Sequence, residues 1–397
     1  MANVSSSNGL EKRPKLRFPG FDEPYKQCRI GDIYAERSQR GASDMELLSV
    51  TMNDGVKPRS AIEGKDNSSE DKSNYKIVRK GDMVYNSMRM WQGANGISPC
   101  DGIVSPAYTV LMPKQEINNG YFAALFKSVN LINEFRKNSQ GMTSDTWNLK
   151  YPQIETIKVQ IPSVSEQDKV SELFSVLDER IAAQSQLVES LKKYKRGLLH
   201  DVLSEKIKIT TETWMEHRIG EFLHSKSIKQ LPTTDAPLMA FTATGGVCDK
   251  GERYDRGFLV KDASSKLYKR TDLNDFIYSS NNLDVGSIGL NLYGSAVISD
   301  VYEIFSIKDA DPWFISEAIK QKPIMSRILK YRQGCLYGQY RIYAEDFLGV
   351  FVKIPSYEAQ KKIGAVFSKI DGKIMQEQIL LDCLEKARTF FLQQLFI

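Results

Sequence analysis

Apolar residues recur at alternating steps of four and three along two long stretches of the chain. This heptad spacing is that of a coiled-coil seam. The first stretch, from about Glu166 to Leu203, carries Val170, Phe174, Leu177, Ile181, Val188, Leu191 and Leu198. The second carries Ile363, Phe367, Ile370, Ile374, Leu381, Leu384 and Phe391. The pattern therefore predicts two long helices, each of which needs a partner.

The two apolar stripes can cover one another within one chain, because an unpaired stripe of this length would be an exposed aggregation surface. Gln184 and Glu377 fall on equivalent seam positions where an apolar residue is expected. Our hypothesis is that they meet and fix the register of the helices; the alternative is that both are solvated. The residues predicted to form the helix-helix packing are Val170, Phe174, Leu177, Ile181, Leu191, Ile363, Phe367, Ile370, Ile374 and Leu384.

The chain also repeats itself. The segment Ile161–Gln167, which begins Ile-Pro-Ser and ends in Gln, returns 193 residues later as Ile354–Gln360. At the same spacing Asp82–Ser87 matches Asp275–Ser280, and Arg-Ile-Gly followed by an acidic residue opens both copies. The sequence therefore predicts two similar units, each a mixed domain followed by one long helix. A duplication without special function is the alternative.

Outside the predicted helices the pattern changes to short runs of β-forming residues bounded by Gly, Asn and Asp. Examples are Met83–Tyr85, Tyr108–Leu111 and Phe258–Val260, whereas Tyr121–Phe126 and Trp313–Ile319 predict short helices. Each domain is thus expected to hold a mostly antiparallel sheet. The predicted fold class is α+β, with two α/β domains separated by two long antiparallel coiled-coil helices and an internal pseudo-two-fold repeat.

The predicted domain bounds follow the change of pattern. We expect an N-terminal domain at residues 1–164, a first coiled-coil helix at 165–208, a C-terminal domain at 209–357 and a second coiled-coil helix at 358–397. A helix of about 38 residues is about 57 Å long. That length corresponds to about 17 base pairs of B-DNA. Domains at the ends of such helices could read sites between one and two helical turns apart.

Composition narrows the class of protein without fixing it. The hydrophobic fraction of 41% and the charged fraction of 26% are those of an ordinary globular protein. Neither an apolar stretch of membrane-spanning length nor a signal-peptide core is found, which predicts a cytoplasmic protein without a membrane partner. The five cysteines contain no C-x-x-C pair. A net charge of +5 permits a polyanionic partner but does not require one.

The sequence lacks recognisable catalytic motifs. It contains neither a phosphate-cradling G-x-x-x-x-G-K-[ST] loop nor the Asn-Pro-Pro-aromatic motif of adenine methyltransferases. The three histidines, His200, His217 and His224, match no zinc spacing. The sequence therefore predicts a non-catalytic protein with no catalytic residues, no metal site and no cofactor of its own.

The loops between the strands are rich in residues that can contact DNA. Arg, Asn and Gln can read base edges through paired hydrogen bonds, while Lys and backbone N–H groups hold phosphates. Surface solvation is the alternative for each residue, and for the basic run Lys192–Arg196 the alternatives are phosphate contact and stabilisation of a helix end. The candidate DNA-binding residues are Arg89, Gln92, Thr143, Ser144, Asn148, Asn281, Asn282, Arg332, Gln339 and Arg341.

Together, the repeat, the heptads and three motifs resemble the specificity subunit of type I restriction-modification enzymes over nearly the whole chain. The motifs are the opening Pro14–Phe21, each Ile-Pro-Ser with a Gln five residues after its Pro, and Lys193–Leu199 near the end of the first helix. The second helix departs from the family pattern at Lys386–Phe396, where it is followed at once by the last residue of the sequence.

The resemblance implies a role in choosing DNA sites. Such a subunit binds double-stranded DNA, two methyltransferase subunits and restriction/translocase subunits, and it directs adenine methylation and restriction by these partners. Each of its target-recognition domains reads one half of a split sequence, with an unread spacer set by the helices. S-adenosylmethionine, ATP and Mg belong to the partner subunits.

Two other classes of function stay open at the level of sequence. A two-domain coiled-coil scaffold that binds proteins would bind DNA weakly and with little sequence preference. An enzyme with a dispersed active site would be active without a methyltransferase partner.

Overall fold

The computed structural model describes residues 13–41, 44–52, 55–64, 66, 68–209, 211–243, 245–249, 266–281, 283–284, 286–336 and 339–397, without the side chains of Cys335, Leu336 and Gln339. The chain divides into two compact units. The first unit comprises residues 1–186 and 379–397, and the second comprises residues 187–378. Each unit therefore contains one mixed domain together with a section of each long helix.

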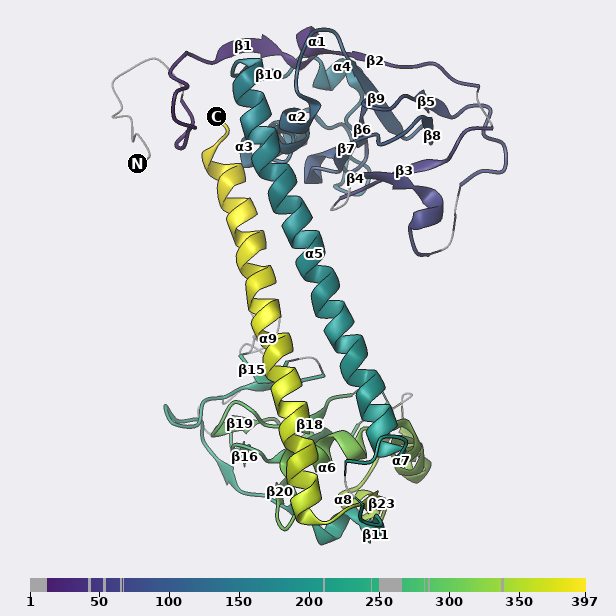
Figure 1. Ribbon diagram of the computed structural model, residues 1–397, viewed down its shortest axis with the longest axis vertical. Helices are drawn as coiled ribbons and strands as arrows, with labels where there is room; N and C mark the ends of the chain where they lie inside the picture. The colour runs from purple at the N-terminus through teal and green to yellow at the C-terminus, as the bar shows by residue number, and fades with distance from the viewer. Residues whose placement is uncertain are drawn as a thin grey trace. The chain divides into compact units, whose positions relative to one another are not determined.

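The first unit is built on a four-stranded antiparallel sheet with the strand order β2-β9-β6-β7 (Figure 1). Alternate residues of the central strands face opposite sides. Met83 and Tyr85 pack against helices α2 and α3, whereas Val84 and Val110 pack against the pairs β3-β4 and β5-β8. Both faces of the sheet are thus buried, which explains why its strands are short and continuously apolar.

The helices and strands of the first unit follow the repeat unit in chain order. They are β1 (Lys26–Arg29), α1 (Ile30–Ile33), β2 (Tyr34–Glu36), β3 (Leu48–Thr51), β4 (Gly55–Pro58), η1 (Arg59–Ala61), β5 (Lys76–Val78), β6 (Met83–Asn86), η2 (Met90–Gln92), β7 (Asn95–Ile97), β8 (Gly102–Val104), β9 (Tyr108–Pro113), α2 (Asn119–Leu125), α3 (Val129–Asn138), α4 (Tyr151–Ile154), β10 (Lys158–Ile161) and α5 (Val164–Leu203).

The second unit repeats this plan with the sheet β12-β20-β17-β18. Phe276 and Tyr278 face a core that contains Phe314 of α6, whereas Ile277 and Ile304 face the opposite side. Its elements are β11 (Met215–Arg218), η3 (Ile219–Glu221), β12 (Leu223–Ser225), β13 (Lys229–Gln230), β14 (Ala240–Thr242), β15 (Gly246–Cys248), β16 (Tyr268–Thr271), β17 (Phe276–Ser279), β18 (Ile288–Leu290), β19 (Ala296–Ile298), β20 (Tyr302–Ile307), α6 (Pro312–Ile319), α7 (Lys322–Ile328), η6 (Leu329–Tyr331), β21 (Gln333–Leu336), β22 (Gln339–Arg341), α8 (Ala344–Leu348), β23 (Phe351–Ile354) and α9 (Tyr357–Gln394).

The predicted mixture of helices and strands is confirmed. The expected strands Met83–Tyr85 and Tyr108–Leu111 lie in β6 and β9, and every strand pair described is antiparallel. The expected helices lie in α2 and α6. Phe258–Val260 lies outside the described residues. Among the described helices, none is both long enough and apolar enough to cross a membrane.

A buried glutamine fixes the start of each long helix. In the first unit, Gln167 donates from Nε2 to the carbonyl of Pro162 over 3.1 Å, and its Oε1 accepts from the backbone N of Asn118 over 3.0 Å. In the second unit, Gln360 makes the same two bonds to the residues 193 positions later, over 2.9 and 3.1 Å. The glutamine after each Ile-Pro-Ser therefore ties the start of the helix to the cap of the neighbouring helix.

The sections of α5 and α9 that belong to one unit run antiparallel within it. In the first unit the rings of Phe174 and Phe396 stack at 5.9 Å, and Arg388 pairs with Asp178. In the second unit, Lys195 donates to Asp371 over 2.8 Å. Since Asp178 and Asp371 are 193 residues apart, as are Lys195 and Arg388, the two ion pairs are equivalent under the repeat.

The predicted packing residues lie on the sheltered side of these helices. Val170, Phe174, Ile363 and Phe367 are at most 4% exposed. The half-buried residues of the set are Leu177, Ile181, Leu191, Ile370, Ile374 and Leu384. The predicted pairing of the two complete helices as one coiled coil, and the predicted domain bounds, stay predictions.

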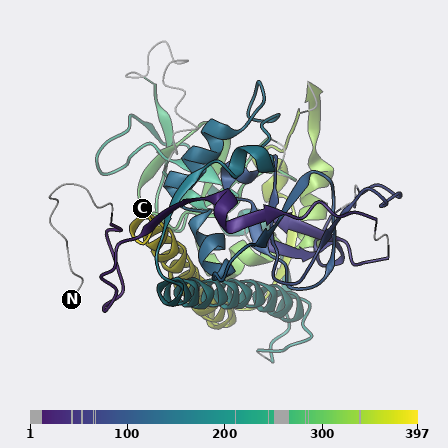
Figure 2. The same cartoon turned by 90° about the horizontal axis from the view of Figure 1, so that it is seen from above.

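The two ends of the described chain meet in the first unit. The backbone N of Leu16 donates to the carbonyl of Gln394 over 3.0 Å, and Leu395 and Phe396 are buried in the core of the unit. The purple N-terminal segment and the yellow end of α9 lie side by side in both views (Figures 1 and 2). At the end of α5, Ile207 makes the equivalent bond to the carbonyl of Asp201, which lies 193 residues before Gln394.

Candidate nucleic-acid interface

Two polar loops lie next to each other at one end of the central sheet in the first unit. The first loop follows β6 and forms the short helix η2, with Arg89 at its N-cap and Gln92 as its last residue. Gly93 ends this turn in the left-handed conformation, with a φ of 85°, which glycine adopts without strain. The chain then returns into β7. This turn fixes the backbone that carries two of the predicted DNA-binding residues.

The second loop is closed by a backbone pair between Gln140 and Asn148, with hydrogen bonds of 3.0 and 2.8 Å. Thr143 and Thr146 bond to each other inside it, and Met142 at its tip is fully exposed. The loop therefore projects from the unit as a preformed turn. Thr143 and Ser144, both predicted as DNA-binding, are exposed on it.

The two loops are joined by backbone and ring contacts. Leu149 donates from its backbone N to the carbonyl of Ser87 over 2.9 Å. The rings of Trp91 and Trp147 meet edge to face at 5.2 Å, and the guanidinium of Arg136 lies 5.5 Å from the ring of Trp91. The structure thus brings Arg89 and Gln92 to the same surface as Asn148 and its loop. We name this surface, comprising residues 86–92 and 140–148, the first loop pair.

Sequence reasoning missed the aromatic contact. Trp91 and Trp147 each stand next to a predicted DNA-binding residue, but a tryptophan in a loop gives no indication of its ring partner. Arg136 belongs to α3, where it reads as an ordinary solvated cation. Base-stacking rings and a cation over a ring are common at nucleic-acid surfaces.

The second unit places its loops in the same way. Ile342 donates to the carbonyl of Ser280 over 2.9 Å, and Asn281 pairs with Arg341. The strands β21 and β22 form the hairpin, with Gln333 opposite Arg341. Each of these residues lies 193 positions after its counterpart in the first unit. We name residues 279–284 and 332–341 the second loop pair.

Several polar contacts order the second loop pair. The guanidinium of Arg332 lies 4.7 Å from the ring of Tyr340, whose hydroxyl pairs with Asp284. Burial, and then the hydrogen bond to Asp284, raises the pKa of the Tyr340 hydroxyl above its usual value, so it stays protonated at neutral pH. Arg341 donates from Nη2 to Glu303 over 3.0 Å and lies over the ring of Tyr343. Glu303 belongs to β20 and escaped the sequence analysis.

Two of the predicted DNA-binding residues cannot be placed. Asn282 lies outside the described residues, as does the side chain of Gln339. The roles of the whole predicted set in DNA binding stay predictions. In the basic run, Lys195 is 18% exposed and bonds to Asp371, with Glu317 3.5 Å away. These contacts give that lysine a role in packing the helices.

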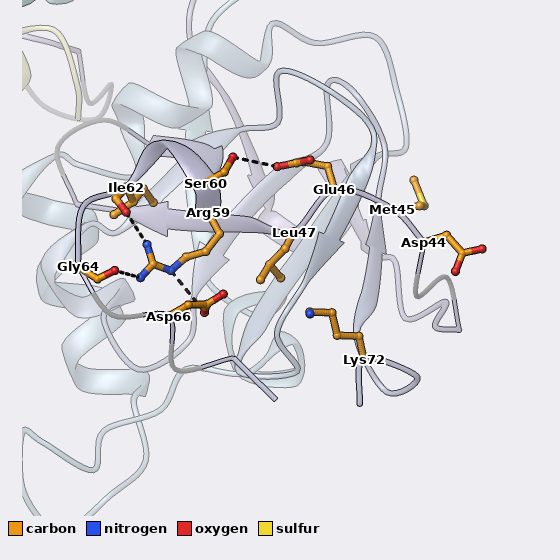
Figure 3. Close-up of a pocket in the computed structure, with 10 residues that line it drawn as sticks. All are labelled: Asp44, Met45, Glu46, Leu47, Arg59, Ser60, Ile62, Gly64, Asp66 and Lys72. Atoms are coloured by element: carbon orange, nitrogen blue, oxygen red, sulfur yellow. Dashed lines mark hydrogen bonds and ion pairs between the residues drawn. The ribbon is translucent and has the colours of Figure 1, made fainter. Parts of the chain in front are cut away.

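A polar cavity of about 540 Å³ lies elsewhere in the first unit, beside η1 (Figure 3). Its arginine, Arg59, is bonded to the carbonyls of Ile62 and Gly64 and pairs with Asp66 at 3.6 Å. Ser60 donates to Glu46 over 3.2 Å. These groups satisfy one another, so the cavity shows no sign of a built ligand site. Within the described part of the chain, no cluster of His, Cys, Asp and Glu could hold a metal ion.

Comparison with known proteins identifies the family. Residues 23–193 match the model of the type I restriction modification DNA specificity domain. Two solved structures resemble the whole chain. The type I restriction-modification system S subunit from M. genitalium superposes with a TM-score of 0.63 at 16% identity, covering 97% of this chain and 99% of that one.

The second solved structure is a chain of a type I R-M system whose description concerns complex assembly and conformational transition. It superposes with a TM-score of 0.54 at 14% identity, covering 96% of this chain and 99% of that one. Among curated proteins, no match is found.

A repeated α+β unit with a polar loop pair, together with the family match, defines a sequence-specific DNA-recognition subunit. The chain belongs to the type I restriction-modification DNA specificity family through its domain at residues 23–193. The fold of the S subunit extends this likeness over nearly the whole chain.

Proposed function

We propose that the chain reads a bipartite double-stranded DNA target, one half with each loop pair. The observation that carries this proposal is the equivalence of the two loop pairs. Leu149 bonds to Ser87 and Ile342 bonds to Ser280, so one backbone frame recurs at a spacing of 193 residues. The side chains on the frame differ, with Asn148 in the first unit and Arg341 in the second. A shared frame with different readers suits two unlike half-sites.

The proposed spacer between the half-sites is set by α5 and α9 acting together as one antiparallel coiled coil. Support comes from the ion pairs Asp178–Arg388 in the first unit and Lys195–Asp371 in the second. A single antiparallel register accounts for both pairs, and the repeat exchanges one for the other. Helices paired in this way would relate the two target-recognition domains by a pseudo-two-fold axis.

The proposed role is non-catalytic and depends on partners. The chain would bind two methyltransferase subunits and the restriction/translocase subunits, and so direct adenine methylation and restriction to its target in the cytoplasm. S-adenosylmethionine, ATP and Mg would be bound by those partners. The basis for this step is the match to the DNA specificity domain.

Methylation sequencing tests the proposal. DNA from cells that contain this chain and its cognate methyltransferase is compared with DNA from cells that lack only this chain. The expected result is adenine methylation at a split motif, present only with the chain. The same methylation in both cell lines, or methylation without a split motif, would contradict the proposal.

A further inference from the structure

The two loop pairs differ at a pair of positions that touch each other. In the second unit, Arg341 closes the hairpin and donates to Glu303 of β20. In the first unit, Asn148 stands at the place of Arg341. Thr109 stands at the place of Glu303, because Tyr85 pairs with Thr109 as Tyr278 pairs with Glu303. The arginine and its carboxylate partner therefore occur together in one unit and are both replaced in the other.

The structure holds Arg341 in one orientation. Its backbone pairs with Gln333 and with Asn281, and its guanidinium lies 5.0 Å from the ring of Tyr343. The bond from Nη2 to Glu303 uses one of the five N–H donors of the group. The side chain is still 45% exposed. A fixed guanidinium with an exposed face is preorganised to bind a planar acceptor group.

Glu303 is itself fixed from the other side. Its Oε2 lies 3.0 Å from the Nζ of Lys269, which also donates to the carbonyl of Tyr302 over 2.7 Å. The equivalent lysine of the first unit, Lys76, pairs with Glu36 of β2 instead. The second unit thus keeps the lysine but takes its carboxylate from β20, where the other oxygen reaches Arg341.

The carboxylate also indicates what Arg341 contacts. An acid beside an arginine repels a phosphate group but does not oppose a contact with a neutral base edge. Paired N–H donors of arginine match the O6 and N7 acceptors of guanine in the major groove. On the basis of the proposed function, we infer that Arg341 reads a guanine in one half-site and that Glu303 is the residue that positions it.

Methylation sequencing of variants in the complete complex tests this inference. Arg341→Met removes the donors, and the fraction methylated at sites with the guanine is expected to fall about tenfold to hundredfold relative to sites that differ only at that base. Glu303→Gln keeps the arginine charge and is expected to weaken discrimination at the same position to a smaller extent. The other half-site should stay unchanged.

Two further variants sharpen the test. Lys330→Met removes an exposed cation of the same unit outside the second loop pair, and it should leave every position of the motif unchanged. The double variant Glu303→Thr/Arg341→Asn installs the residues of the first unit and should abolish the preference for guanine at that one position. This variant keeps the test informative if Glu303→Gln alone destabilises the unit by leaving Lys269 without its carboxylate.

The outcomes separate this inference from the proposed function. If the unaltered chain directs no methylation at a split motif, the proposed function fails. If it does, but Arg341→Met lowers methylation equally at all sites, Arg341 contacts phosphate and the inference fails alone. Relaxation at a base other than guanine, or in both half-sites, would also overturn it.

Discussion

Arg17 joins the N-terminal segment to the first turn of α5. Its guanidinium donates from Nε and Nη2 to the two carboxylate oxygens of Glu166, over 2.9 and 2.8 Å. The hydroxyl of Tyr25 donates to the same carboxylate over 3.2 Å, and Glu166 is only 1% exposed. Hydrogen bonds from both neighbours compensate the cost of burying this charge. The conserved geometry of a two-point bond also fixes the path of the segment across the helix.

Removal of Arg17 should destabilise the first unit. In Arg17→Met the Glu166 carboxylate stays buried without its counter-charge, which costs about 3 kcal/mol or more. Denaturant unfolding monitored by hydrogen exchange should show the loss in residues 13–186, with the second unit unaffected. Lys15→Met, a neighbouring exposed cation, is the control. Equal stability of the two variants would contradict the role given to the pair.

Asp272 makes the second unit sensitive to acid. Burial acts to raise the pKa of its carboxyl, but hydrogen bonds from Lys226, Ser295 and Arg270 outweigh burial and hold the pKa well below its usual range. A carboxyl whose pKa is lower in the folded state stabilises the fold above its unfolded pKa of about 3.9. That stabilisation is lost as the pH falls towards the folded pKa.

Asp272→Asn should therefore be less stable than the unaltered chain at neutral pH, and the difference should shrink below about pH 4. Denaturant midpoints for the second unit, measured between neutral pH and strong acid, test this sign. Asp300→Asn disrupts an exposed pair with Lys229 and should change the midpoints little. A difference that stays constant down to the lowest pH would exclude the carboxylate as the cause.

At the scale of elements, Gln167 and Gln360 do the same work in the two units. Each is at most 2% exposed and bridges the Pro-Ser turn before a long helix to the N-terminal cap of a short one. Asn118 and Asp311 supply those caps and accept from backbone N–H groups of α2 and α6. The glutamine thus couples the direction of the long helix to the domain that it leaves.

Replacing either glutamine by alanine should leave a buried carbonyl and a buried N–H without partners. The expected cost is about 1–3 kcal/mol per variant. Hydrogen exchange should show Gln167→Ala opening only the first unit and Gln360→Ala opening only the second. The two variants serve as controls for each other. A loss that spreads over both units, or is absent from one, would show that the two bridges are not equivalent.

Local patterns predicted most of the elements but not their pairing. The heptads and the Ile-Pro-Ser motifs predicted α5 and α9, and the short apolar runs predicted β6 and β9. The strand order could not be predicted, because both faces of each sheet are buried and the alternation that fixes a register is absent. The contact between Trp91 and Trp147 was missed for a similar reason, since it joins residues 56 positions apart through the fold.

The candidate site was predicted in outline. The frame that carries Asn148 and Arg341 follows from the repeat, and both residues were among those predicted. Glu303 was missed because it lies in a strand, 38 positions before Arg341, where an acidic residue usually indicates a solvated face. Side-chain pairing across a sheet edge depends on backbone register, which a single sequence does not specify.

At the scale of the whole molecule, the net charge of +5 supports binding to a polyanion. Because cations that contact phosphates release counterions, we expect the affinity of the complex for DNA to fall steeply between about 50 and 200 mM salt. Fluorescence anisotropy with a duplex of the methylated motif and with a scrambled duplex provides the measurement. A flat response to salt would count against DNA binding.

The meeting of Leu16 with Gln394 has a consequence for biosynthesis. A ribosome makes the first unit's main segment early, but the unit lacks Leu392, Leu395 and Phe396 of its core until translation reaches the last residues. The second unit is continuous in sequence, from residue 187 to residue 378. It can therefore complete its own core while the earlier-made unit still waits, so that synthesis and folding proceed in opposite order.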